Sequence, residues 1–168
     1  MTTAQTHPAA VLQPASDAAV RESNLMQLSS ELLGVGRRRP VLSRFDVHKA
    51  IMAGDLAFSA LIHLIGALKT MEEHDITRAL GISGRTLRRH RETPKKAMPP
   101  DLASKTWLFA ETLARASEVF GARDAAEEWL TKPAVGLDDQ RPVDLLQTVQ
   151  GTELVNDFLT RLEYSVYS

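Results

Sequence analysis

The spacing of large apolar residues constrains the fold of this chain more than any other feature. From residue 22 onward these residues recur mostly three or four positions apart, and no segment alternates between apolar and polar residues as a half-buried strand does. One such stripe consists of Leu56, Leu61, Leu64, Ile65 and Leu68. Glycine and proline residues separate the stripes, as they do between short helices. The pattern predicts an all-α protein.

Two segments have the spacing of a capping box, in which a hydroxyl residue and an acidic residue three positions later satisfy the first backbone N–H groups of a helix. These segments are Ser43 with Asp46 and Thr70 with Glu73. We therefore expect a helix to begin at each hydroxyl residue. Further helices are expected over residues 101–120, 124–130, 142–147 and 152–164.

The net charge of −1 hides a strongly uneven distribution. Residues 69–96 carry eight Lys/Arg and four Asp/Glu, a net charge of +4, whereas residues 97–168 carry six and twelve, a net charge of −6. Such asymmetry indicates two surfaces with different partners. We expect the acidic residues of the second region to lie at solvent-facing positions.

Several classes of function are excluded by composition. The chain has no cysteine, so disulfides, thiolate–zinc sites and a cysteine nucleophile are ruled out. No cluster of nucleophile and base is visible, and the histidines lack a second ligand at helical spacing, so we expect no enzymatic activity, cofactor or metal. The longest apolar stretch, residues 56–68, is shorter than the roughly 20 residues that span a bilayer. With no visible secretory signal, a cytoplasmic protein is expected.

The sequence DITRALGISGRTLRRHR, residues 75–91, has the pattern of a helix-turn-helix. Ile76 and Leu80 lie on one face of the first predicted helix, and Gly81 permits the positive φ of a sharp turn. Leu87 lies on the inner face of the second predicted helix. An α-helix fits the major groove of DNA, where Arg binds guanine through two hydrogen bonds.

The second helix of this motif carries the candidate DNA-binding residues. Its outward face holds Arg85, Arg88 and Arg89 for base edges or nearby phosphates, while the following cations are better suited to phosphates. The alternative is a solvated basic helix in a generic bundle. The predicted DNA-binding set is Ser83, Arg85, Arg88, Arg89, Arg91, Lys95 and Lys96.

The C-terminal region carries an ordered series of short motifs. They are WLTKP at 129–133, Leu137, RPVDLLQT at 141–148, Gly151, Val155 and LTRLEYSVY at 159–167. Behind a predicted helix-turn-helix, this series resembles the toxin-binding domain of the Xre/MbcA/ParS family of bacterial antitoxins. The expected organisation is a flexible arm with a possible short helix (1–40), a helix-turn-helix DNA-binding domain (41–98) and a small helical toxin-binding domain (99–168).

The resemblance implies that the chain binds a RES-domain toxin and covers its active-site cleft. Such toxins consume NAD or use it to ADP-ribosylate a target. It also implies that the antitoxin binds its own operator DNA and represses its operon. Because helix-turn-helix proteins usually bind DNA as dimers on half-sites about 34 Å apart, we expect a homodimer within a larger toxin–antitoxin complex.

The predicted toxin-binding residues come from the motifs and from the end of the chain. By the resemblance, Arg141 and Asp144 fall on the family's loop-and-helix motif and Arg161 on its last helix. The chain also ends with aromatic residues, whereas termini are usually polar, and aromatic anchors dominate interface energetics. Alternatively, this tail packs on its own domain. The predicted set is Arg141, Asp144, Arg161, Glu163, Tyr164, Val166 and Tyr167.

A stand-alone helix-turn-helix transcriptional regulator is the main alternative to an antitoxin. In that case the acidic C-terminal domain would serve dimerisation or bind a small ligand.

Overall fold

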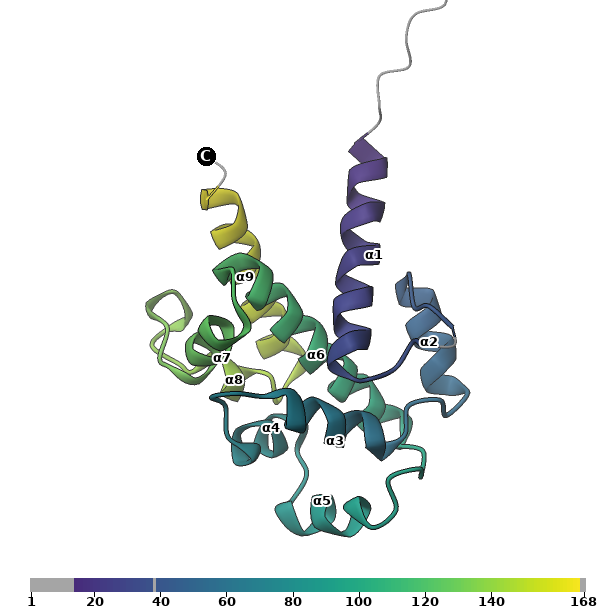
Figure 1. Cartoon of the computed structure of the whole chain (residues 1–168). Helices are drawn as coiled ribbons and strands as arrows, with labels where there is room; N and C mark the ends of the chain where they lie inside the picture. Colours follow the sequence, from purple (N-terminus) through teal and green to yellow (C-terminus); the bar gives the residue numbers. More distant parts are fainter. Residues whose placement is uncertain (1–13, 38, 167–168) are drawn as a thin grey trace, which may run out of the picture.

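The computed structural model describes residues 14–37 and 39–166. Within these ranges the backbone is helical, with one short 3₁₀ helix at Val135–Leu137 and no strand, so the predicted all-α class is confirmed (Figure 1). The α-helices are α1 (Pro14–Leu32), α2 (Arg44–Met52), α3 (Phe58–Ala67), α4 (Glu73–Leu80), α5 (Gly84–Arg91), α6 (Pro100–Phe120), α7 (Arg123–Thr131), α8 (Pro142–Leu145) and α9 (Val149–Val166).

The first helix is longer than the sequence pattern predicts. Residues 14–20, expected within a flexible arm, form the start of α1, and residues 1–13 lie outside the described part. Pro14 is the first residue of the helix, where its missing N–H costs nothing, and Asp17 lies in the first turn, where its negative charge is favourable. Met26 and Leu32 are buried in the core.

One of the two expected capping boxes is present, and the other prediction is wrong. Ser43 caps α2 by accepting a hydrogen bond from the backbone N–H of Asp46. In contrast, α4 begins at Glu73 behind Glu72, which makes no side-chain cap. Thr70 is instead engaged elsewhere, because its hydroxyl group donates to a carboxylate oxygen of Glu127, 3.2 Å away.

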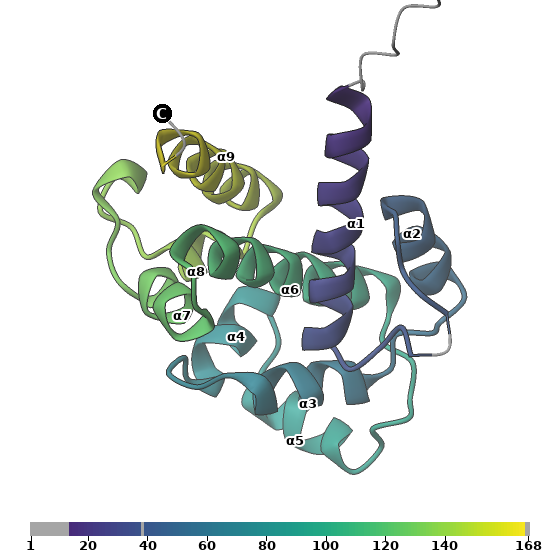
Figure 2. The same ribbon diagram turned by 45° about the horizontal axis from the view of Figure 1, so that its top comes forward.

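Helix α6 is the centre of the molecule. It packs against α1, α2 and α4 and also against α7 and α9, and Figure 2 shows it crossing the middle of the fold. Trp107 and Leu113 are buried, and alanines such as Ala110 let neighbouring helices approach closely. The buried apolar residues of the described chain belong to one cluster. Helices on both sides of Pro99 therefore share a single hydrophobic core.

Two acidic side chains of the C-terminal region are buried, which contradicts the expectation that these acids face solvent. Glu111 accepts hydrogen bonds from the Trp107 indole at 3.2 Å and from the Arg44 guanidinium at 2.5 Å. Glu127 on α7 is fully buried. Buried carboxylates are tolerated because such donors satisfy their oxygens.

The Glu127 carboxylate holds the segment that leads from α3 into α4. It accepts hydrogen bonds from the backbone N–H groups of Lys69, Thr70 and Met71, at 2.9, 2.7 and 2.9 Å for the shortest contact of each. A carboxylate accepting several N–H bonds is strongly held, and these donors would otherwise lack a protein partner. Glu127 therefore fixes the start of α4 relative to α7.

Replacing Glu127 with alanine should lower the free energy of unfolding by about 3 kcal/mol, because several backbone donors lose their acceptor. Urea denaturation followed by circular dichroism measures this loss. Glu128→Ala is the matched control. Within the described residues the exposed Glu128 carboxylate forms an ion pair only with Lys132, one turn later, so the change should stay below about 0.5 kcal/mol. Equal effects of the two substitutions would contradict the role of Glu127.

Candidate functional site

Helices α4 and α5 are joined by a tight turn at residues 81–83 and are called the α4–α5 unit. Gly81 ends α4 with φ of 69°, and the backbone N–H of Ile82 bonds to the carbonyl of Thr77 at 3.0 Å. Ser83 caps α5 by accepting from the N–H of Thr86. Leu87 is fully buried. The turn glycine and the buried anchor are thus where the sequence pattern predicts them.

The predicted DNA-binding residues lie on α5 and directly before and after it, and all of them are exposed. The charge of Arg91 is partly neutralised, because its guanidinium forms an ion pair with Glu73 at 2.5 Å. The guanidinium of Arg89 lies 3.4 Å from the His90 ring. The remaining members of the set form no ion pair within the described chain; they are Ser83, Arg85, Arg88, Lys95 and Lys96. The face is therefore largely available to an anionic partner.

His90 anchors the end of α5 in the protein interior. Its ring is buried and stacks on Phe58 of α3, with ring centroids 3.6 Å apart. Burial lowers the pKa of His90, and the nearby charges of Arg89 and Lys96 lower it further. The neutral ring thus serves as packing beneath the basic face.

Arg141 and Asp144, two predicted toxin-binding residues, contact α4. Arg141 is half-buried: its guanidinium lies 2.5 Å from a carboxylate oxygen of the buried Asp75 and donates to the Thr131 carbonyl at 2.9 Å. The hydrogen bond to Asp75 raises the pKa of Arg141. Asp144 forms an ion pair with Arg78 at 3.2 Å. These two ion pairs join α8 and the residue before it to α4, the first helix of the α4–α5 unit.

Arg161, Glu163 and Tyr164, also predicted to bind toxin, lie on the last turns of α9. Arg161 is exposed over the Phe158 ring, 5.6 Å from its centroid, and Tyr164 is 65% exposed. Glu163 is half-buried, between Arg115 at 3.7 Å and Arg21 at 3.8 Å. Val166 is the last helical residue, with its side chain outside the described part, and Tyr167 lies outside the described residues. The structure therefore splits the predicted set into two groups.

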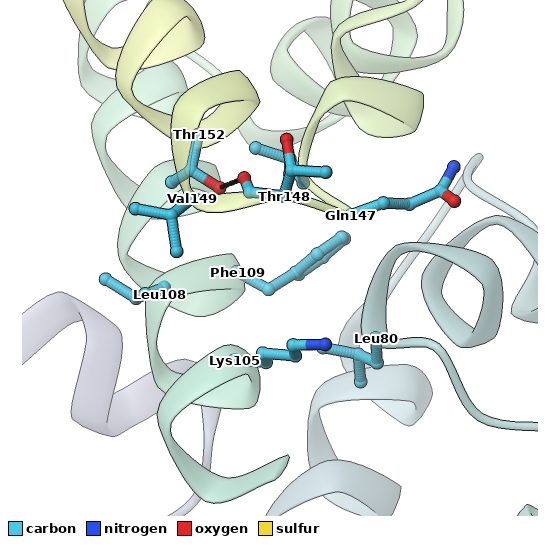
Figure 3. Close-up of a pocket in the computed structure, with 9 residues that line it drawn as sticks. Leu80, Lys105, Leu108, Phe109, Gln147, Thr148, Val149 and Thr152 are labelled. Atoms are coloured by element: carbon cyan, nitrogen blue, oxygen red, sulfur yellow. Dashed lines mark hydrogen bonds between the residues drawn. The ribbon is translucent and has the colours of Figure 1, made fainter. Parts of the chain in front are cut away.

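A small pocket between α4, α6 and the start of α9 was not indicated by the sequence (Figure 3). Its rim includes Leu108 and Val149, which are exposed although apolar. The first turn of α9 lies against the end of α8: a Cβ atom at Gly151 would be 1.9 Å from the carbonyl oxygen of Leu145. Only long-range packing brings these segments together, so no local motif reveals the pocket. The lining residues are Leu80, Lys105, Leu108, Phe109, Leu146, Gln147, Thr148, Val149 and Thr152.

Comparison with known proteins links the C-terminal helices to one family. Residues 115–164 match the C-terminal toxin-binding domain of the antitoxins Xre/MbcA/ParS. The antitoxin Xre of Yersinia enterocolitica is 33% identical over 108 residues, which cover 64% of this chain and 70% of that protein. The antitoxin Xre of Pseudomonas putida is 30% identical over 122 residues, covering 71% and 72%. This chain belongs to the Xre/MbcA/ParS family of antitoxins.

Membership makes the chain an antitoxin of a toxin–antitoxin system and assigns a toxin-binding role to its C-terminal part. It also points to a regulatory rather than a catalytic role. The matched residues run from the middle of α6 to the exposed end of α9, whereas the α4–α5 unit lies outside them. Among the described residues, no helix has the length and apolar character needed to span a bilayer.

Proposed function

We propose that this antitoxin neutralises a RES-domain toxin through the last turns of α9. The observation that carries the proposal is the match to the toxin-binding domain, which ends at residue 164, where the Tyr164 side chain is largely exposed. The net charge of −6 over residues 97–168 supports it, because the cleft of a toxin that uses anionic NAD is expected to be basic. Covering this cleft would stop NAD consumption or ADP-ribosylation of a target.

A chain that ends at Glu163 tests the role of the tail. It retains the buried Val155 and Leu159 and the ion pair of Glu163 with Arg115, so it should fold normally. Because it lacks the aromatic end, co-expression with a cognate RES toxin should arrest growth, whereas the full-length chain should protect. A chain ending at Ser165 serves as a control that retains Tyr164. Full protection by the shorter chain would show that the inhibitory contacts lie elsewhere.

We further propose that the α4–α5 unit is a helix-turn-helix that binds operator DNA and represses the antitoxin's own operon. Its support is the exposed basic face of α5 and the adjoining lysines, since cations that contact phosphates supply most of the affinity for DNA. A homodimer would place two such faces on half-sites about 34 Å apart. The proposal requires the protein to act in the cytoplasm, where the operator lies.

Replacing both Arg85 and Arg89 with alanine should abolish the preference for operator over random DNA, because these side chains would lose their contacts to base edges. Lys95→Ala should instead weaken binding to every sequence and reduce the slope of log K against log salt by about 0.9. Fluorescence anisotropy over a salt series measures both effects. Unchanged operator preference in the double arginine variant would rule out this face as the reader of sequence.

A further inference from the structure

A groove runs between α1 and the end of α9, with α6 as its floor. In Figure 1 the N-terminal end of α1 and the C-terminal end of α9 both lie at the top of the view, with a space between them. The groove is lined by Ala18, Arg21, Glu22, Asn24, Leu25, Arg44, Arg115, Glu118, Val119, Thr160, Glu163 and Tyr164.

One wall of the groove belongs to the matched toxin-binding domain and the other does not. Six lining residues, on α6 and α9, fall between residues 115 and 164, whereas α1 lies far outside that range. Tyr164 and Glu163, both predicted to bind toxin, are at its edge. The groove is therefore continuous with the surface assigned to toxin binding.

Each arginine that lines the groove already contacts a carboxylate of the chain. Arg44 binds the buried Glu111 at 2.5 Å, and Arg115 donates to the hydroxyl group of Thr160 at 2.6 Å and approaches Glu163. Arg21 is exposed and lies 3.8 Å from Glu163. Such an exposed pair is weak and opens at little cost.

Two carboxylates that line the groove, Glu118 and Glu22, form no ion pair within the described chain. Within the described chain, Glu118 has no ion pair or hydrogen bond, and the Glu22 side chain accepts only a 3.4 Å bond from the Arg44 backbone. The groove therefore presents two carboxylates that form no ion pair within the described chain. Glu118 lies on its floor and Glu22 on the α1 wall. Partial burial and the charge of Glu163 raise the pKa of Glu118, and the charge of Arg115 lowers it by less, so a further cation beside Glu118 would be favourable.

We propose that this groove receives a basic side chain, Lys or Arg, from a segment of the toxin, and that α1 forms one wall of the toxin interface. The inference rests on the proposed neutralisation of a RES toxin and extends it to a helix outside the family match. A guanidinium or ammonium group seated there lies near Glu118 and Glu22 and displaces the weak Arg21 contact.

Charge reversal tests the groove directly. The dissociation constant for a cognate RES toxin should rise about tenfold for Glu118→Lys and several-fold for Glu22→Lys, since like charges then meet. Glu153→Lys is the matched control, because Glu153 is exposed on α9, makes no ion pair in the described chain and does not line the groove; it should change binding less than twofold. Circular dichroism checks that each variant is folded, and Glu118→Gln gives a smaller loss without charge reversal.

Photo-crosslinking tests the role of α1 independently. A benzoylphenylalanine in place of Asn24, which lines the groove, should crosslink to the toxin, whereas the same group in place of the exposed Gln27, which does not line it, should not.

The outcomes separate this inference from the proposed function. If the wild-type chain fails to bind the RES toxin, the proposed function is wrong and the groove proposal falls with it. If wild type binds but the lysine variants bind equally well, the groove proposal alone is overturned. It is also overturned if Glu118→Lys changes only self-association in analytical ultracentrifugation, since the occupant would then be a second copy of the chain.

Discussion

The position of α4 depends on buried carboxylates that lie far apart in the sequence. Glu127 on α7 binds the backbone just before α4, and Asp75 on α4 binds Arg141 just before α8. A buried charge that loses its partner costs several kcal/mol, so these contacts hold α4 in place against the C-terminal helices. The proposed DNA-binding face is therefore oriented by residues of the toxin-binding part.

Local chemistry in the sequence predicted local structure well. Gly81 forms the predicted turn after α4 and Ser43 caps α2 as predicted, because each acts within a few residues. The helix at 14–20 was missed because this segment lacks the large apolar residues that form a helical stripe. Glu127 was misjudged for a different reason: its backbone partners are more than 50 residues away, and no periodicity reveals which acid is buried.

The uneven charge of the chain corresponds to separate places in the fold. In both Figures 1 and 2, α5 and the C-terminal end of α9 lie at different ends of the molecule. A toxin at α9 and DNA at α5 would therefore contact different residues. Because Arg141 and Asp144 connect these regions through α4, substituting either residue affects the support of the α4–α5 unit as well as the matched domain.

A double-mutant cycle on Asp75 and Arg141 tests most directly whether buried charges join the two parts. Unfolding free energies are measured in urea for wild type, Asp75→Asn, Arg141→Met and the double variant. We predict a coupling free energy of about 2 kcal/mol, because each single substitution leaves a buried polar partner without its match. Additivity within about 0.5 kcal/mol would contradict the proposed coupling, since residues without energetic contact behave in that way.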